Sequence, residues 1–274
     1  MKIFINIRLT DAPEDTGKAL IDPSDRGLTL GDGMFETMAV RGGRISRLDA
    51  HLARLRHGAG VLGIEAPMAN EGLSEALGSV IEANAITEGV LRLTITRGPS
   101  PRGLLGPETP TPSLIIAASA NAPGSTGPTA PVTAVIVTGT RRNEHSPLSR
   151  IKSLNYLDNI LAAREARDKG ADEALLLNGA GKLASASSSN LFAVIEGDLV
   201  TPPTVDGCLD GVMRADVLRA LDGTERSLTT DDLAGASEAF LTNCLSVRPL
   251  ISVNCAPIGN CHAGPVTEQA QKLL

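Results

Sequence analysis

Several residue types and patterns are scarce or missing in this sequence. Aromatic residues make up only 2% of the 274 positions, with no Trp and one Tyr. The core must therefore be built from Leu, Ile, Val and Ala, which a hydrophobic content of 42% can supply. No run approaches the roughly 20 apolar residues that a membrane-spanning helix needs. The amino terminus lacks the apolar block and cleavage site of a signal peptide, so we expect a cytoplasmic protein without a membrane partner.

Charge and cysteine content exclude further classes of protein. The chain carries 25 Lys and Arg against 31 Asp and Glu, a formal charge of −6 without basic runs, which argues against a nucleic-acid partner. The four cysteines form no Cys-x-x-Cys pair, and a chain of this length needs no disulfides, so we expect reduced thiols. The four scattered histidines have no metal-ligand spacing, and no metal site is predicted.

The hydrophobic pattern predicts an α+β chain in two lobes, with short strands and separate helices. Strands are expected at 3–9, 34–40, 90–97, 113–120, 132–138 and 173–178, a strand–turn–strand at 191–200, and helices from 49 and at 73–84, 155–169 and 211–221. The Pro/Gly/Ser/Thr-rich run at 121–131 has no apolar anchor and is typical of a linker. The predicted domains are therefore a small α/β domain at 1–120 and a larger domain at 132–274.

Lysine is also scarce, so chemistry that needs a lysine has few candidates among the six in the chain. Lys152 lies between apolar residues, just before a predicted helix. Apolar surroundings disfavour the ammonium form and free the amine for attack on a carbonyl. The alternative is a half-buried structural lysine that extends its amine to water, and spacing alone favours that alternative.

Two other features could bind a phosphate. Gly211, at the predicted start of a helix, would leave backbone N–H groups free at the positive end of the helix dipole. An ordinary helix capped by Asp210 is the simpler interpretation. Arg54 could add a guanidinium to the same anion, although by itself it is a solvated arginine on a helix face.

Eight groups of short motifs occur in a recognisable order along most of the chain. They are Asp25-Arg26-Gly27 with Gly31-Asp32-Gly33-Met34-Phe35-Glu36-Thr37, His51-Leu52-Ala53-Arg54-Leu55, Thr96-Arg97-Gly98 with Pro101-Arg102-Gly103, Ile151-Lys152-Ser153-Leu154-Asn155-Tyr156-Leu157, Asp172-Glu173-Ala174-Leu175, Ser189-Asn190-Leu191-Phe192, Thr201-Pro202-Pro203 and Leu209-Asp210-Gly211-Val212-Met213-Arg214. Together they resemble the fold-type IV family of pyridoxal-phosphate enzymes. That family includes branched-chain and D-amino-acid aminotransferases and 4-amino-4-deoxychorismate lyase.

The resemblance implies the cofactor, pyridoxal 5'-phosphate, and the residues that hold it. Lys152 matches the lysine that condenses with the cofactor and later moves the proton. Arg54 matches the arginine on the cofactor phosphate, and Val212 and Met213 match the residues whose backbone N–H groups complete the phosphate cup. Tyr156 stands where some members place a tyrosine near the phenolic oxygen of the cofactor.

The resemblance also implies a fold and a substrate class. The family fold is a small α/β lobe and a larger barrel-like lobe that binds the cofactor, and the predicted linker falls at their junction. Arg102 stands where the family presents a loop arginine to the carboxylate of a small amino acid-like substrate, across the interface of a homodimer.

One position departs from the family pattern. The family places a glutamate five residues before the asparagine of Asn-Leu-Phe, where it pairs with the pyridine nitrogen of the cofactor; counting back from Asn190 leads to Ser185. A neutral serine leaves that nitrogen largely unprotonated, so the ring withdraws electrons less strongly. This loss should harm a transamination more than a lyase reaction whose product is aromatic. Asn243 in Thr242-Asn243-Cys244-Leu245 resembles the lyase pattern too.

We therefore expect a lyase that converts 4-amino-4-deoxychorismate into 4-aminobenzoate and pyruvate, a step towards folate. Lys152 would remove the ring proton, and Thr37 or Asn243 would orient or protonate the leaving group. The second hypothesis is an aminotransferase of branched-chain or D-amino acids, which Tyr156 and Glu36 also fit. The third is a cofactor-binding protein with little activity, suggested by Ser185.

Overall fold

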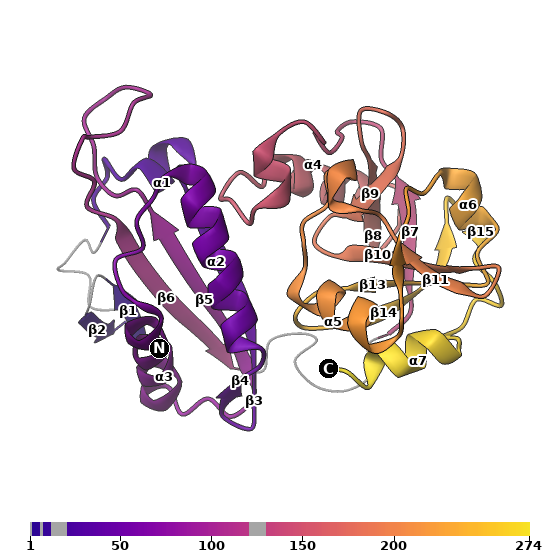
Figure 1. Ribbon diagram of the computed structural model, residues 1–274, viewed down its shortest axis with the longest axis horizontal. Helices are drawn as coiled ribbons and strands as arrows, with labels where there is room; N and C mark the ends of the chain where they lie inside the picture. Colours follow the sequence, from indigo (N-terminus) through magenta and orange to yellow (C-terminus); the bar gives the residue numbers. More distant parts are fainter. Residues whose placement is uncertain (1, 6–7, 12–20, 121–129) are drawn as a thin grey trace. The chain divides into compact units, whose positions relative to one another are not determined.

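The computed structural model describes the backbone of residues 2–5, 8–11, 21–120 and 130–274. The chain divides into two compact units, unit 1 being Met1–Thr126 with Ile151–Asn155 and unit 2 being Gly127–Arg150 with Tyr156–Leu274 (Figure 1). Residues 121–129 of the predicted linker lie outside the described residues. One segment departs from the predicted domains, because Ile151–Asn155 packs in unit 1 although it lies within the predicted second domain.

Unit 1 is built on a sheet with the strand order β2-β1-β6-β5-β3-β4, in which each neighbouring pair is antiparallel. The expected strands at 34–40, 90–97 and 113–120 are confirmed as β3, β5 and β6. The single strand expected at 3–9 is wrong, because Lys2–Ile5 and Arg8–Asp11 form two separate strands that pair antiparallel with each other. The strands are β1 (Lys2–Ile5), β2 (Arg8–Asp11), β3 (Gly33–Arg41), β4 (Arg44–Ile45), β5 (Gly89–Thr96) and β6 (Ser113–Ala120).

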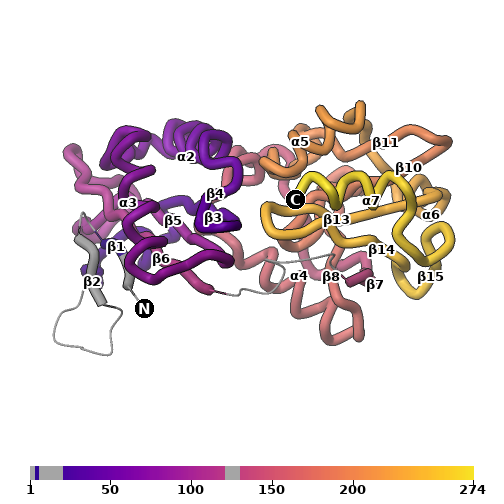
Figure 2. The backbone as a smooth tube through the Cα atoms, turned by 90° about the horizontal axis from the view of Figure 1, so that it is seen from below, coloured from indigo at the N-terminus to yellow at the C-terminus, as the bar shows by residue number. Residues whose placement is uncertain are grey.

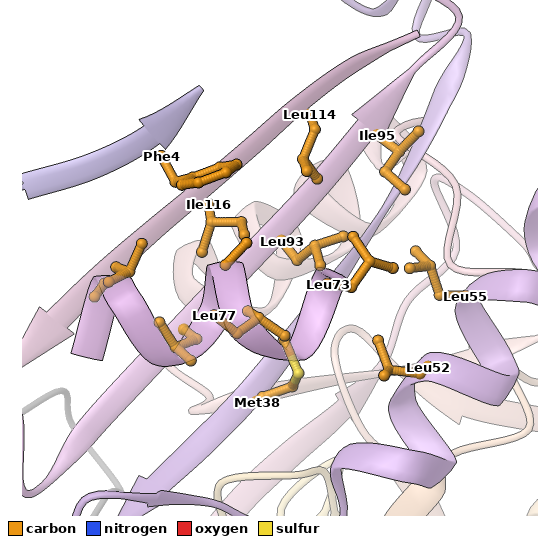
Figure 3. Packing of buried hydrophobic residues seen from close by; sticks show 14 of the residues in the cluster. Phe4, Met38, Leu52, Leu55, Leu73, Leu77, Leu93, Ile95, Leu114 and Ile116 are labelled. Carbon is orange, nitrogen blue, oxygen red and sulfur yellow. The ribbon is translucent and has the colours of Figure 1, made fainter. Parts of the chain in front are cut away.

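Two helices cover one face of this sheet, and α1 (Arg26–Leu30) precedes β3. Helices α2 (Leu48–Leu62) and α3 (Asn70–Ala83) each place apolar residues three and four positions apart, so one side of each helix is buried. Each fully buried Leu or Ile contributes roughly 1.5–3 kcal/mol to stability. Figure 3 shows these side chains meeting those of the strands, among them Leu52, Leu55, Leu73, Leu77, Leu93, Ile95, Leu114 and Ile116.

Unit 2 is built on a mixed sheet with the order β12-β11-β10-β13-β14-β7-β8-β9, and β15 pairs with β14. Strand β7 pairs in parallel with β14 and β8, β12 pairs in parallel with β11, and the other pairs are antiparallel. The strands are β7 (Val132–Ile136), β8 (Glu173–Leu177), β9 (Leu183–Ala186), β10 (Asn190–Ile195), β11 (Asp198–Thr201), β12 (Thr224–Glu225), β13 (Glu238–Thr242), β14 (Val247–Val253) and β15 (Ala256–Pro257).

The strand order requires this sheet to curl. Strands β10 and β9 are five neighbours apart, which is roughly 24 Å in a flat sheet. Only residues 187–189 connect them, a link that spans at most about 14 Å. The sheet therefore bends back on itself, and its concave side encloses a core of Leu, Ile, Val and Ala side chains. This is the larger barrel-like lobe that the resemblance implies.

Helices pack on the outside of the curled sheet. Helix α4 (Leu157–Asp168) places Ala162 and Ala166 against β7 and β8. Helices α5 (Val212–Ala220) and α7 (Pro265–Gln271) pack against β10, β13 and β14, as the tube view of Figure 2 shows. Phe192 and Phe240 stack there with ring centroids 5.1 Å apart, so two of the few aromatic residues lie in this core. Helix α6 (Thr230–Ala234) lies near β10.

Helix α4 begins at Leu157, two residues later than the pattern predicts. A contact with a distant part of the sequence accounts for the later start. The side-chain amide of Asn155 donates to the carbonyl oxygen of Gly31 at 3.1 Å and holds the residues before the helix in unit 1. Among the helices that the structure describes, none is long and apolar enough to cross a membrane.

Candidate functional site

Lys152 lies at the edge of the unit 1 sheet. The backbone N–H of Phe35 donates to the carbonyl oxygen of Lys152 at 2.9 Å, and the N–H of Leu154 donates to Gly33 at the same distance. These bonds extend the sheet beside β3. They place Nζ of Lys152 over the Phe35 ring, 4.4 Å from its centroid. The amine therefore borders an aromatic surface, as the apolar neighbours of Lys152 in the sequence suggest.

The same sheet face carries two more polar side chains. Residues alternate between faces along a strand, so Thr37 lies on the Phe35 face of β3. Thr37 is the register partner of Arg92 on β5, and the Arg92 guanidinium carbon lies 3.8 Å from the Phe35 centroid. Lys152 and Arg92 thus both lie over the Phe35 ring, on the sheet face that Thr37 shares. Arg92 was not among the predicted site residues. It occupies the outward position between the buried Leu91 and Leu93 of β5.

Arg54 reaches β3 from the opposite face. Its Nε donates to Oε1 of Glu36 at 2.8 Å and its Nη2 donates to Oε2 at 2.6 Å, a two-bond pairing of guanidinium and carboxylate. The Glu36 side chain is 1% exposed and that of Arg54 is 13% exposed. The expectation of a solvated arginine on a helix face is therefore wrong. The carboxylate of Glu36 fixes the orientation of the Arg54 guanidinium.

His51 completes this buried cluster. Its Nδ1 lies 2.7 Å from Oε2 of Glu36, and its side chain is 1% exposed, so it is a satisfied polar residue of the kind expected for the histidines. Burial favours the neutral form of Glu36, but the hydrogen bonds from Arg54 and then from His51 outweigh it and lower the pKa of Glu36 below its ordinary value. Glu36 is thus ionised at neutral pH.

The start of α5 in unit 2 has an open arrangement of backbone N–H groups. Gly211 is the N-cap residue, and no side chain caps this helix. Asp210 does not act as the cap that its position suggested; it pairs with Arg214 at 3.3 Å and its side chain is 63% exposed. Gly211 therefore offers no side-chain acceptor to the N–H groups of Val212 and Met213 in the first turn. A helix start of this kind favours an anion.

The backbone at Gly211 also lies close to a side chain of β10. A Cβ atom at Gly211 would lie 2.1 Å from Oδ1 of Asn190, so the backbone approaches that side chain more closely than any other residue type allows. Asn190 pairs with Thr242 across β10 and β13. Within the described part of the chain, the buried hydroxyl oxygen of Thr242 has no hydrogen-bond partner. A bound phosphate would supply an acceptor for that hydroxyl.

Ser185 is buried on β9, opposite Leu176 of β8. Two residues further along, the Ser187 hydroxyl donates to the carboxylate of Glu173, which also lies 3.8 Å from Arg248. That carboxylate is therefore held by other partners. The side chain of Ser185 itself is neutral.

Tyr156 is the N-cap residue of α4, in unit 2. Burial lowers the pKa of the nearby Arg142, and the interaction with Tyr156 opposes this effect. Arg142 donates to the carbonyl oxygens of Gly207 at 2.9 Å and Ser149 at 2.6 Å, so it ties together the segments around Tyr156.

Asn243 closes a turn between β13 and β14. Its Oδ1 accepts from the N–H groups of Leu245 at 2.9 Å and Ser246 at 3.1 Å, and its Nδ2 donates to the hydroxyl of Ser189 at 3.2 Å. These bonds account for an asparagine at this position. Its expected part in catalysis stays a prediction.

Arg102 lies in an exposed loop of unit 1 that follows β5. The structure therefore distributes the predicted residues, with Lys152, Thr37, Arg54 and Arg102 in unit 1 and Tyr156, Ser185, Val212, Met213 and Asn243 in unit 2. In the described part of the chain, no group of three or more His, Cys, Asp or Glu side chains is arranged to hold a metal ion.

Comparisons with known proteins agree with this fold. The sequence model of the class IV amino-transferases matches residues 33–253. The D-alanine aminotransferase of Bacillus licheniformis is 29% identical over 280 residues, which cover 100% of this chain and 96% of that protein. Among solved structures, the branched-chain amino acid aminotransferase of Escherichia coli has a TM-score of 0.89 at 25% identity, covering 99% of this chain and 92% of that one. A Legionella pneumophila protein provisionally named a 4-amino-4-deoxychorismate lyase has a TM-score of 0.85 at 28% identity, covering 95% of this chain and 96% of that one.

Proposed function

Because the chain belongs to the class IV amino-transferase family, we propose that it is the lyase of that family, converting 4-amino-4-deoxychorismate into 4-aminobenzoate and pyruvate. The observation that carries this choice over an aminotransferase is the neutral, buried Ser185 at the position where the family resemblance implies a glutamate. The similarity to the Legionella pneumophila protein named for this lyase supports the same choice.

Enzymes of this family use pyridoxal 5'-phosphate. The uncapped start of α5, the close approach at Gly211 and the unpartnered hydroxyl of Thr242 fit a phosphate group. We propose that the N–H groups of Val212 and Met213 hold that phosphate together with Arg54. Lys152 would hold the cofactor covalently and Tyr156 would contact its phenolic oxygen. When bound, the cofactor withdraws electrons from the substrate carbon whose C–H bond breaks.

Ser185 bears on how strongly those electrons are withdrawn. A carboxylate keeps a pyridine nitrogen protonated, whereas a serine hydroxyl carries no charge to do so. The carboxylate of Glu173 is already engaged by Ser187 and lies near Arg248. Transamination needs a long-lived carbanion, and a weak electron sink makes that carbanion costly. Formation of an aromatic ring supplies much of the driving force of the lyase reaction, so the lyase tolerates the serine better.

The remaining residues then have the following proposed roles. The Lys152 amine removes the ring proton as a general base, and Thr37, on the same sheet face, orients or protonates the departing enolpyruvyl oxygen. Asn243 is the alternative for that last role. The substrate carries two carboxylates, and the guanidinium groups of Arg102 and Arg92 are the proposed partners for them.

The proposal is tested by incubating the purified, cofactor-loaded protein with 4-amino-4-deoxychorismate. Equimolar 4-aminobenzoate and pyruvate should appear, and the Lys152→Ala protein should form neither. Absence of 4-aminobenzoate with the wild-type protein would remove the lyase proposal.

The second candidate is an aminotransferase of branched-chain or D-amino acids. It is favoured by the similarity to the Bacillus licheniformis and Escherichia coli aminotransferases and by Tyr156. Conversion of the cofactor to its pyridoxamine form by an amino acid, at a rate that matches turnover, would select this candidate. Ser185→Glu should raise that rate, whereas the uncharged Ser185→Gln should not.

The third candidate is a cofactor-binding protein with little activity. It would be supported if the wild-type protein binds the cofactor, shows neither activity, and gains one through Ser185→Glu. For each candidate we propose a homodimer that acts on small amino- and carboxylate-bearing molecules. We also propose a cytoplasmic location for each candidate, whereas a place in folate synthesis follows only from the lyase proposal.

A further inference from the structure

Two arginines of unit 1 share one carboxylate. Nε of Arg26 and Nε of Arg97 both donate to Oδ2 of Asp32 at 2.8 Å, and Nη2 of Arg97 donates to Oδ1 at 3.2 Å. Burial favours the neutral form of Asp32, but the hydrogen bonds from Arg97 and then Arg26 outweigh it and lower its pKa. The carboxylate is therefore charged at neutral pH and orients both guanidinium groups.

The two arginines use their other nitrogens differently. Arg26 donates from Nη1 to the carbonyl oxygen of Gly103 at 2.9 Å and from Nη2 to that of Leu104 at 2.7 Å. Arg97 donates instead to the carbonyls of Leu62 and Gly63 at the end of α2, at 2.7 and 3.0 Å. Arg26 thus connects Asp32 to the residues that directly follow Arg102, and Arg97 connects the same carboxylate to a helix.

The loop of residues 98–107, called here the Arg102 loop, has few apolar anchors of its own. Its first limb is tied to the segment before α1, since Arg26 N–H donates to Gly98 at 3.0 Å and Ser100 N–H donates to Ser24 at 3.3 Å. Beyond Ser100 the side chains are exposed, and those of Leu104 and Leu105 reach 86% and 91%. Packing therefore contributes little to residues 101–105; near the end of the loop, Gly106 lies against the side-chain stem of Arg97, which Arg97→Lys largely keeps. The two bonds from the 5% exposed Arg26 hold the Gly103 and Leu104 carbonyls in place.

We infer that Arg26 is a positioning residue for Arg102, holding the backbone beside it so that its guanidinium meets the substrate carboxylate from a set direction. The inference rests on the role proposed above for Arg102. It also explains the residue type, because Arg26 donates from all three of its guanidinium nitrogens, whereas the three donors of a lysine lie on a single nitrogen and lack this planar spread.

The test compares Arg26→Lys with the matched control Arg97→Lys, both as cofactor-loaded full-length protein. In each variant the lysine keeps a positive charge near Asp32 but lacks the planar guanidinium group. Only Arg26→Lys loses the hydrogen bonds to the Gly103 and Leu104 carbonyls of the Arg102 loop. Trypsin cleavage after Arg102, followed by mass spectrometry, reports loop opening without any substrate. Cleavage after the exposed Arg141 of unit 2 serves as the internal reference.

For Arg26→Lys we expect cleavage after Arg102 to rise about tenfold, as the loss of two ordinary hydrogen bonds implies. KM for the substrate should rise by about the same factor, with kcat within about twofold of wild type, because the lost interaction aligns a binding group. Arg97→Lys should change the Arg102 cleavage rate and KM by less than about twofold.

The inference is overturned if Arg26→Lys leaves either the cleavage rate or KM unchanged, or if Arg97→Lys alters both equally. Failure of the proposed function shows differently, as a wild-type protein that forms no 4-aminobenzoate. If the wild type instead converts an amino acid, KM is measured for that amino acid. If the wild type turns over no substrate, the rate of trypsin cleavage after Arg102 alone tests the inference. Should Arg26→Lys fail to fold, Asp32→Asn, which keeps the shape and removes the orienting charge, must raise cleavage after Arg102.

Discussion

A buried charge is tolerated in this protein where several donors converge on it. Glu36 has donors from Arg54 on one side and His51 on the other, and all three side chains are largely buried. Removing one member of such a group leaves the others without their partner, which costs more than the intact group contributes. The cluster therefore orients Arg54. Its effect on stability is measured by removing one member and comparing the free energy of unfolding.

Glu36→Gln should lower the free energy of unfolding at neutral pH by about 3 kcal/mol, since Arg54 is left without its counter-charge. The folded-state pKa of Glu36 lies below its ordinary value of 4.5, so its stabilisation is present above that pH and is lost as pH falls through the folded-state pKa. Unfolding by urea, measured between about pH 3 and pH 7, should show the two proteins converging at the acid end. The exposed Glu196→Gln is the control, and a difference independent of pH would contradict the assignment.

Lys152→Ala should abolish retention of the cofactor absorbance band on gel filtration. It should also reduce turnover at least about a thousandfold, because covalent attachment and proton transfer are lost together. Lys169→Ala is the matched control, since Lys169 forms a surface pair with Glu165 at 2.6 Å. A Lys152→Ala protein that keeps both the band and the activity would refute the role of this amine.

At the scale of elements, several of the predicted site residues lie at a helix start and at a sheet edge, where backbone groups are not all used within the element. Helix α5 begins without a side-chain cap, and its N-cap residue lies against Asn190 of β10. The sheet edge beside Gly33 and Phe35 accepts the segment that carries Lys152. In both cases backbone groups left over at an element's end, or at a sheet edge, are available to a neighbour.

Gly211→Ala should destabilise the protein by about 1–3 kcal/mol, because its new Cβ would force Asn190 or the helix start to move. The dissociation constant for pyridoxal phosphate should rise with it. Gly78→Ala is the control: it lies inside α3 with nothing within 4 Å of a new Cβ. That control should stabilise by about 0.5–1 kcal/mol. Thermal unfolding and cofactor fluorescence titrations measure both effects, and equal behaviour of the two variants would contradict the close approach at Gly211.

At the scale of the whole molecule, the chain folds as two units, and one short segment within the sequence of unit 2 packs in unit 1. Residues 151–155 leave unit 2, pair with β3 of unit 1, and return as α4 begins. The predicted lysine and the predicted phosphate-binding helix are thereby built on different units. Each unit carries its own core of buried hydrophobic residues.

The proposed homodimer and the proposed position of Arg102 across its interface are tested together by complementation. Lys152→Ala and Arg102→Ala proteins, each inactive alone, should regain about a quarter of wild-type activity when co-expressed, since half of the dimers then contain one intact site. No recovery, although light scattering shows a mass of twice 28.3 kDa, would mean that Arg102 serves its own subunit.

The helices and central strands follow from hydrophobic spacing because their periodicity is local. Leu52 and Leu55 predict the buried side of α2, and the alternation of Leu91, Leu93 and Ile95 predicts β5. Spacing alone does not predict that the range 3–9 contains parts of two strands, β1 and β2. These two strands pair with each other, and hydrophobic spacing does not show such a pairing. Asp210 is not the cap because α5 begins one residue later than predicted, with Gly211 as its N-cap, and the Asp210 carboxylate pairs with Arg214 instead.

By itself, the sequence determined the order of the family motifs and the choice of Lys152 among six lysines, since both depend only on which residues occur where. The tertiary structure decided that Glu36 holds Arg54, that Arg26 reaches the carbonyls beside Arg102, and that Arg92 lies over the ring shared with Lys152. The contacts of Arg54 and Arg26 join residues 18, 77 and 78 positions apart. Local pattern carries no information on such pairs, because the sheet register and the packing of α2 bring them together.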